Sequence, residues 1–343
     1  ERVEKMEKLS VIIPCYNVEN YIEETIVSLI NQTYKEFTIY CLDDCSSDKT
    51  FDKLLDLQQK YSQIKLFRNE INLGVIETLN KLIALCDSEF IIRMDSDDIF
   101  VYDRVEKLLQ EAEKGKFQIV SSSYSFIDFR GIEIVNKRGL YLCTLDKAIK
   151  FMALLNSPFP SQALFNRQIF DREIFDTEFK VAEDYYFFTK VLKNNDIKVA
   201  NLSEKLYKYR INPNGLSNSN ELLMRQNHYK IAVRYANNIL GVSADDMQFL
   251  EIGLKLLDYN KYSGREVARI LRKLFKVRDL FNTKFSPSPE ERREINLYSK
   301  QYYLYLLYSF ISSPVNSFKK ITGLLGILPT LFNVLNIENI KWL

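Results

Sequence analysis

The chain has 343 residues, and its 47 Lys and Arg residues against 45 Asp and Glu residues leave a formal net charge of +2. This length predicts about two domains with cores of their own, which excludes a small disulfide scaffold. The near-neutral balance excludes the long-range field of a dedicated nucleic-acid binder, so no nucleic-acid partner is expected. A single histidine, His228, excludes sites that need two, such as HExxH zinc proteases, and we expect it on a helix surface.

The cysteines and two segments of the chain indicate the cellular compartment in which the protein is expected. Five cysteines without CxxC spacing predict a reduced, intracellular protein, with Cys15, Cys41 and Cys86 in apolar strands or helices. The charged start ERVEK lacks the apolar stretch of a signal peptide, and the apolar run 321–335 contains Pro329 and is too short to cross a bilayer. We therefore expect a cytoplasmic protein without a transmembrane helix.

Short apolar runs alternate with stretches of helical period over the first 120 residues or so. Strands are predicted at 9–14, 37–42, 64–67, 90–94 and 117–126, the last followed by a turn at Arg130 and Gly131. Helices are predicted after Asn20 and at 51–61, 75–86 and 103–113, the first with a capping box of Asn20 and Glu23. This βα alternation indicates a mostly parallel, doubly wound α/β sheet. From about residue 220 the pattern is helical and rich in Tyr and Phe, which places a boundary there.

Acidic residues follow two of the predicted strands directly. Asp43 and Asp44 come after the second strand, and Asp95, Asp97 and Asp98 come after the fourth. The carboxyl ends of parallel strands meet at one edge of a sheet, so these acids should gather there. Crowded carboxylates favour a hard divalent cation, Mg²⁺ or Mn²⁺, which commonly faces substrate phosphates. Alternatively, the Asp-Ser-Asp-Asp run is only a loop that caps the next helix.

Glycine-rich phosphate cradles are missing from the sequence. Neither GxxxxGK[ST] nor GxGxxG occurs, so a nucleotide would have to be held by acids, a metal ion and side chains.

Five motifs in order resemble glycosyltransferase family 2, the inverting enzymes of GT-A fold that use nucleotide sugars. They are SVIIPCYN (10–17), SLINQTYKEFTIYCLDDCSSDKT (28–50), NLG (72–74), RMDSDD (93–98) and AEDYYFF (182–188). Within the family, the patterns NLGxxxxLN and AEDY, with YKYR downstream, are most similar to bacterial lipooligosaccharide transferases that add N-acetylhexosamine or a hexose. The resemblance covers residues 9 to about 219. It implies a GT-A catalytic domain at 1–220, with a nucleotide-sugar half at about 9–126 and an acceptor half at about 127–220, and a helical region at 221–343.

The resemblance also implies a donor site. Asp44 would bond the uracil, and Pro14 and Tyr16 would border the nucleotide. Arg93 would touch the sugar or phosphates, and Arg210 and Ser217 would contact phosphate. The donor residues implied in this way are Pro14, Tyr16, Asp44, Asn72, Arg93, Asp95, Ser96, Asp97, Glu183 and Arg210. The implied ligands of Mn²⁺ or Mg²⁺ are Asp97, Asp98 and Asn212. For Tyr16 the alternative is a core aromatic at the strand end, and for Arg210 and Ser217 it is a surface role.

In the family's acidic motif the Asp is the general base, which corresponds to Asp184 beside Glu183. It would take a proton from the acceptor hydroxyl as that oxygen attacks the anomeric carbon, giving inversion in one displacement. The alternative is that both acids only favour the dipole of a helix start. The sequence departs from the family pattern at one position. Family members often have a histidine in a YRxH pattern after the base, whereas YRIN in this chain has Asn212 at that position. An amide oxygen can bind Mg²⁺ or Mn²⁺, but it is uncharged.

The partners implied are a UDP-sugar, a saccharide acceptor that could be lipid-linked, and an acceptor-binding loop at 157–162. For the aromatic C-terminal region with Lys319, Lys320 and Lys341, two interpretations stay open. One is packing against the catalytic domain or a second chain, and the other is attachment to the cytoplasmic face of the inner membrane. Two other functions stay open as well, a nucleotidyltransferase of related fold and a phospho-acceptor signalling module.

Overall fold

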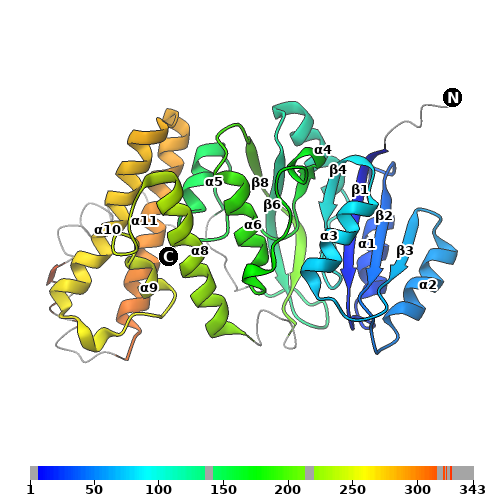
Figure 1. Ribbon diagram of the computed structural model, residues 1–343, viewed down its shortest axis with the longest axis horizontal. Helices are drawn as coiled ribbons and strands as arrows, with labels where there is room; N and C mark the ends of the chain where they lie inside the picture. The colour runs from blue at the N-terminus through cyan, green and yellow to red at the C-terminus, as the bar shows by residue number, and fades with distance from the viewer. Residues whose placement is uncertain are drawn as a thin grey trace. The chain divides into compact units, whose positions relative to one another are not determined.

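The computed structural model describes residues 7–135, 142–212, 220–314, 320, 322, 325 and 326. The chain divides into two compact units (Figure 1). The first comprises residues 1–149 and 157–220, and the second comprises residues 150–156 and 221–343. The predicted site residues that the structure describes lie between Pro14 and Asn212, and all of them belong to the first unit.

The first unit is built on an eight-stranded mixed sheet in the order β3-β2-β1-β4-β7-β6-β8-β5. Strands β1 to β4 are mutually parallel where they pair, β7 runs antiparallel between β4 and β6, and β8 runs parallel to β6. The short β5 pairs antiparallel with β8. The strands are β1 (Glu7–Cys15), β2 (Thr38–Asp43), β3 (Ile64–Arg68), β4 (Ser88–Arg93), β5 (Ile99–Phe100), β6 (Ile119–Ile127), β7 (Leu164–Asn166) and β8 (Val199–Arg210).

Helices connect these strands and cover the sheet. They are α1 (Ile22–Ile30), α2 (Thr50–Lys60), α3 (Val75–Leu85), α4 (Arg104–Gly115), α5 (Asp146–Met152) and α6 (Glu183–Leu192), with 3-10 turns η1 (Arg167–Ile169) and η2 (Thr177–Phe179). Alternate residues of β1, among them Leu9, Val11 and Ile13, join one apolar cluster with the buried faces of α1, α2 and α4. The intervening Ile12 is also buried. Burial of both faces explains why β1 reads as a continuous apolar run.

The strands and helices predicted for the first 127 residues are confirmed, with bounds that shift by one or two residues. The turn after β6 is confirmed as well, because Asp128 accepts the N–H groups of Arg130 and Ile132, and Gly131 adopts a φ of 84°. The predicted capping box at Asn20 is wrong. Helix α1 begins at Ile22 after Tyr21, without a side-chain cap, because a backbone turn on the Val18 carbonyl supplies the acceptor instead.

The second unit is helical in its described part. It contains α8 (Glu221–Leu240), α9 (Phe249–Gly253), η3 (Tyr259–Lys261), α10 (Gly264–Phe285) and α11 (Pro289–Ile311). Capping boxes start α10 at Ser263 and α11 at Ser288. Most of the aromatic run 302–310 is buried, and Tyr308 stays exposed, so this run forms core rather than a free surface. His228 on α8 is half-buried, not fully at the surface.

Cys15 and Cys41 lie in the apolar strands β1 and β2 as predicted, whereas Cys86 follows α3 directly and lies in neither a helix nor a strand. Cys15, Cys41 and Cys86 are buried, and none of the five cysteines, all of which are described, is in a disulfide. Within the described ranges no helix combines the length and apolarity needed to span a bilayer. Lys319, Lys341, Ser217 and most of the apolar run 321–335 lie outside the described residues.

Asn201 of β8 holds the loop 157–162 in place. Its buried side-chain amide donates to the carbonyls of Cys143 and Pro158 at 2.9 and 3.1 Å. We expect Asn201→Ala to lower the free energy of unfolding by about 2–3 kcal/mol, because two buried carbonyls lose their donors. Urea unfolding measures this, with the exposed Asn195→Ala as control. Equal unfolding midpoints for the two variants would contradict the role of Asn201.

Candidate active site

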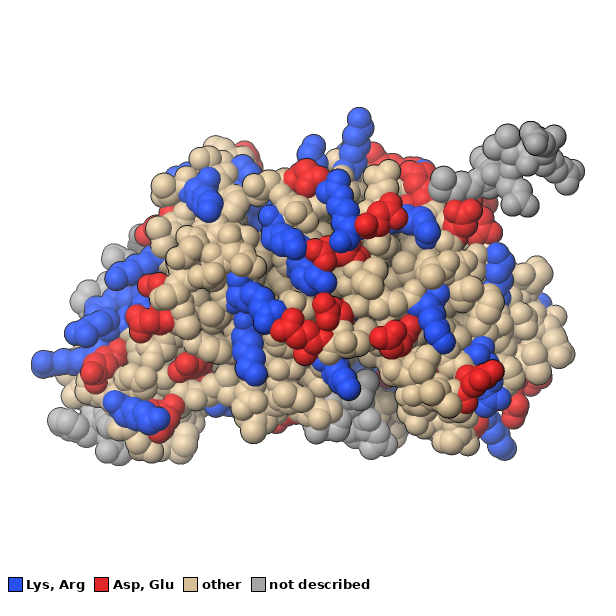
Figure 2. All heavy atoms as spheres, in the orientation of Figure 1, with Lys and Arg blue, Asp and Glu red and all other residues tan. Residues whose placement is uncertain are grey.

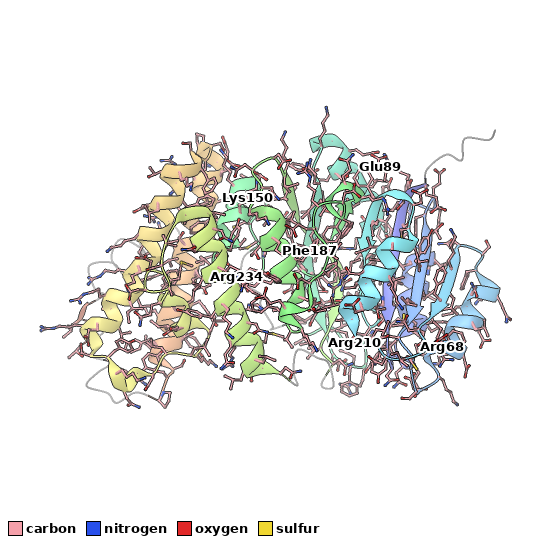
Figure 3. The ribbon with its side chains drawn as sticks, in the orientation of Figure 1. Arg68, Glu89, Lys150, Phe187, Arg210 and Arg234 are labelled. Atoms are coloured by element: carbon pink, nitrogen blue, oxygen red, sulfur yellow. The ribbon has the colours of Figure 1, made fainter. Side chains whose placement is uncertain are left out.

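The two groups of acids lie at the same edge of the sheet. In the parallel register Cys15 of β1 pairs with Asp43 of β2, and Ile12 of β1 pairs with Arg93 of β4. Asp44 and the segment 95–98 therefore leave the carboxyl ends of the two strands that flank β1. Figure 3 labels Arg68 and Arg210, the last residues of β3 and β8, at this same edge. The convergence predicted from the sequence is confirmed.

Asp44 organises the loop before α3. One carboxylate oxygen accepts from the side chain of Asn69 at 2.8 Å and from the N–H of Leu73 at 2.9 Å, and the other accepts from the N–H of Gly74 at 2.8 Å. Gly74 has a φ of 85°, which only glycine adopts without strain. Asp44 is 3% exposed, so this buried carboxylate holds the NLG turn at the carboxyl edge of the sheet.

Arg93 joins the acids of β4 to those of α6. Its Nε donates to Asp95 at 3.2 Å, and its Nη2 donates to Glu183 at 3.2 Å. The guanidinium also lies over the ring of Phe175, at 5.6 Å from the centroid. The side chain is 5% exposed, and its Nη1 is buried without a hydrogen-bond partner. An unpaired buried donor of this kind is costly unless a ligand completes it.

Helix α6 begins at the acidic motif. Ala182, just before it, adopts a φ of 71°, which costs a non-glycine residue on the order of 1 kcal/mol and is a common feature of functional sites. Burial raises the pKa of Glu183 to about 7 and also raises the pKa of Asp184, while the charge of Arg93 opposes both shifts. A pKa raised in this direction makes Asp184 a stronger base than an exposed aspartate. Both acids also lie in the first turn of α6, as the alternative interpretation expects.

Asp97 and Asp98 differ in their surroundings. Burial and the nearby Asp95 raise the pKa of Asp97 to about 6, and the side chain of Asn212 is hydrogen-bonded to Asp97. Asp98 is 1% exposed, and its two oxygens accept from the side chain of Gln162 and from the N–H of Arg210. Both oxygens of Asp98 are thus taken up inside the protein, where they tie β4 to β8.

Arg210 clamps the loops around this cluster. Its Nε donates to the carbonyl of Asp97 at 2.6 Å, and its Nη2 donates to Glu24 at 2.7 Å. Its Nη1 is within 3.3 and 3.4 Å of the carbonyls of Asp128 and Phe129. The side chain is 1% exposed, and this network holds the turn after β6 against the segment 95–98. A contact of Arg210 with phosphate stays a prediction.

The remaining predicted donor residues lie around the same edge. Tyr16 follows β1 and is 49% exposed, so the alternative of a core aromatic is wrong. Pro14 is half-buried near the end of β1, and Asn72 is exposed, with its side chain accepting from the N–H of Gly74. Ser96 is buried, and its carbonyl accepts from Thr25 at 3.0 Å. Their contacts with a nucleotide stay predictions.

No described group of three or more His, Cys, Asp or Glu side chains is arranged to bind one metal ion. The donor set nevertheless fits a divalent cation at Asp97. Burial and the charge of Asp95 disfavour the ionised form of Asp97, and a neighbouring cation would relieve that repulsion. The side-chain amide of Asn212 can supply an oxygen ligand. Each oxygen of Asp98 already accepts one protein hydrogen bond and keeps a second lone pair, and the role of Asp98 as a metal ligand stays a prediction.

Several contacts at this edge were not predicted from the sequence. Ser161 donates to Asp95 at 2.7 Å, and Gln162 donates to Asp98, so the loop expected to bind acceptor also contacts the donor acids. Arg104 is fully buried between the rings of Phe100 and Tyr207 and donates to the carbonyl of Gln162. The signal for the loop was its prolines and its position before the acidic motif, and the sequence gave no signal for Arg104.

Comparison with known proteins identifies relatives of this chain. The family model described as glycosyl transferase family 2 matches residues 10–173. An uncharacterized glycosyltransferase of Haemophilus influenzae is 30% identical over 220 residues, which cover 61% of this chain and 67% of that protein. The glucosyltransferase WfgD of Escherichia coli is 26% identical over 268 residues, which cover 75% of this chain and 98% of WfgD. Its full name is UDP-Glc:alpha-D-GlcNAc-diphosphoundecaprenol beta-1,3-glucosyltransferase.

Among solved structures, the mannosyltransferase PcManGT of Pyrobaculum calidifontis, in complex with GDP-Man and Mn²⁺, matches with a TM-score of 0.56 at 16% identity. The match covers 90% of this chain and 87% of that one. At this identity the likeness concerns the fold alone, and it confirms the GT-A fold expected from the motifs.

The raised pKa of Asp97 predicts that Mn²⁺ binding depends on pH. A carboxylate must lose its proton to bind the cation, so affinity should fall about tenfold per pH unit below a pH of about 6. Titration calorimetry with Mn²⁺ at several pH values measures this. Asp97→Asn should bind weakly at every pH, whereas the exposed Asp87→Asn should behave like the parent chain. Mn²⁺ binding by the parent chain that does not change with pH would contradict the assignment of Asp97 as a ligand.

Proposed function

Since the chain belongs to glycosyltransferase family 2, we propose that it transfers a hexose or N-acetylhexosamine from a UDP-sugar to a saccharide acceptor with inversion. It is an enzyme of the glycosyltransferase class. Family membership argues against the two other functions left open by the sequence, the nucleotidyltransferase and the phospho-acceptor module. The choice of a UDP-sugar as donor is supported by the name of WfgD, which includes UDP-Glc.

The observation that carries this proposal is the Arg93 bridge between the acids of β4 and those of α6. It joins residues that are 90 positions apart in the sequence into one charged cluster at the carboxyl edge of the sheet. Donor phosphates and the acceptor hydroxyl must meet within a few ångströms for a direct displacement. A single cluster that combines a buried guanidinium with a base candidate suits that requirement.

On the donor side, we assign the uridine to the part of the sheet edge next to Asp44 and Tyr16. The loop 72–74 is fixed there by Asp44, and Tyr16 offers an exposed ring for a base or ribose to pack on. The unpaired Nη1 of Arg93 is available to a sugar hydroxyl or to a phosphate oxygen. Arg93 would then contact the donor directly, and its charge would favour the developing diphosphate.

Asp184 is the proposed general base. Burial raises the pKa of Asp184, which strengthens its affinity for the acceptor proton, and the charge of Arg93 opposes that rise. The acceptor oxygen would lose its proton to Asp184 as it forms the bond to the anomeric carbon and the bond to the diphosphate breaks. One carboxylate suffices because the donor is already activated.

Asp97 and Asn212 would hold a divalent cation, Mn²⁺ or Mg²⁺. Such a cation, when bound, neutralises charge on the departing diphosphate. The PcManGT complex, which contains Mn²⁺, supports this choice by analogy of fold. Asp95, held by Arg93 and Ser161, would fix the backbone from which Asp97 projects.

The acceptor is proposed to be a growing glycan of the bacterial surface. WfgD acts on a diphosphoundecaprenol-linked sugar, which supports a lipid-linked acceptor for this chain as well. A lipid-linked acceptor would place the enzyme at the cytoplasmic face of the membrane. The loop 157–162 would approach the acceptor, since it already borders the acids.

A donor screen tests the proposal. Incubating the chain with UDP-sugars, Mn²⁺ and lipid-linked or free saccharides should release UDP and give a product heavier by one sugar, as measured by mass spectrometry. Release of pyrophosphate, or no release with any UDP-sugar, would contradict it.

Asp184→Asn should lower the transfer rate by about 10²–10⁴-fold, because an amide cannot accept the proton. UDP binding, measured by calorimetry, should stay within about twofold of the parent value, since Asp184 is not assigned to the donor. The control Asp171→Asn removes an exposed carboxylate nearby in sequence and should keep the parent rate. Unchanged turnover in Asp184→Asn would exclude it as the base.

Arg93→Gln should move the acidic limb of the kcat–pH profile to higher pH. Arg93 opposes the upward pKa shifts of Glu183 and Asp184, so without it protonation of the base begins at a higher pH as the pH falls. The matched control Arg172→Gln removes a surface charge that pairs with Asp196 and should leave the limb in place. A limb that moves to lower pH, or not at all, would count against this coupling.

A further inference from the structure

Helix α10 of the second unit concentrates positive charge. Its 22 residues contain seven Lys and Arg but only two acids, although the whole chain has a net charge of +2. Figure 2 shows Lys and Arg side chains gathered over the helix that Figure 1 labels α10. The two acids are both engaged locally, because Glu266 closes the capping box and Asp279 pairs with Arg278.

Four of the basic residues form one stripe along the helix, which we call the basic face. Arg265, Arg269, Arg272 and Lys276 follow the spacing i, i+4, i+7, i+11, which keeps them within about 60° of arc over about 17 Å. All four are exposed. The opposite side of α10 is buried and apolar, so the orientation of the stripe is fixed by the core.

The basic face is poorly neutralised by the described residues. Arg265 and Arg269 make no ion pair or hydrogen bond to any of them, and Arg272 donates only to the carbonyl of Gly326 at 3.3 Å. Lys276 is within electrostatic reach of Asp246. Three guanidinium groups without a carboxylate partner in this part of the chain create a field that attracts anions.

Exposed leucines accompany these charges. Leu280, one turn beyond Lys276, is 50% exposed, and Leu325, beside the Gly326 that contacts Arg272, is 62% exposed. A soluble polyanion would gain nothing from apolar side chains among the arginines. A bilayer surface takes up both, because headgroup phosphates pair with arginines while leucines enter the boundary with the acyl chains.

We propose that the basic face of α10 binds the surface of an anionic phospholipid bilayer. The charge of the leaflet complements the four basic side chains, each of which adds to the attraction near the surface. The inference goes beyond the proposed transferase activity and can be tested without it. If the acceptor is lipid-linked, this contact would hold the enzyme at the surface that carries the acceptor.

Flotation of the full chain with vesicles tests the proposal. The parent chain should float with vesicles of phosphatidylcholine and phosphatidylglycerol, should stay behind with phosphatidylcholine alone, and should release the anionic vesicles at high salt. The variant Arg265→Gln/Arg269→Gln/Lys276→Gln should bind anionic vesicles on the order of 100-fold more weakly. Its thermal unfolding should match the parent chain, since all three side chains are exposed.

A matched variant controls for total charge. Lys60→Gln/Lys114→Gln/Lys116→Gln removes the same number of charges from exposed positions of the first unit and should float like the parent chain. Equal flotation of the α10 variant and the parent would overturn the proposal, as would equal binding to neutral vesicles. Binding to heparin without any flotation would overturn it in favour of a soluble polyanion. UDP release with a soluble acceptor, measured on the same variants, reports on the transferase function separately.

Discussion

The active edge depends on one buried cation. Arg93 ends β4 inside the protein and bonds Asp95 and Glu183, two acids that would otherwise repel each other. Removing a guanidinium from water is costly, and the cost is offset only when carboxylates surround it. The placement of α6, and with it the proposed base, follows from this requirement. The same charge limits how far the pKa values of Glu183 and Asp184 can rise.

A second hydrogen-bond network, around Asp98 and Arg210, lies next to the cluster of Arg93. Asp98 accepts from Gln162 and Arg210, and Arg210 in turn holds the Asp97 carbonyl and Glu24. Arg104, buried under Phe100 and Tyr207, donates to the backbone of Gln162, and burial lowers its pKa to about 10. The loop 157–162 is therefore held on both sides. A rigid loop of this kind keeps the acids at fixed distances, which catalysis by positioning requires.

The two units divide the physical tasks proposed for the enzyme. The first unit gathers carboxylates and two buried arginines at the sheet edge to which we assign the charged donor. The second unit buries most of its described aromatic run 302–310 and carries basic side chains on the exposed side of α10. A transferase whose acceptor is attached to a lipid needs both properties, a site for chemistry and a surface for the bilayer.

The sequence by itself determined what is local. Strand β1, the acids after β2 and β4, and the helix periods follow from hydrophobic pattern and from residues adjacent in the chain, and parallel topology then brings Asp44 and Asp95 to one edge. Only the tertiary structure decided which side chains meet across long separations. Arg93 with Glu183, Ser161 with Asp95 and Arg210 with Glu24 depend on how β7, α6 and β8 pack, and no periodicity encodes that. The cap of α1 shows the same limit, because a backbone turn at Val18 replaced the expected Asn20 side chain. Pairing of charged groups over such distances is set by burial and geometry, which exist only in the folded chain.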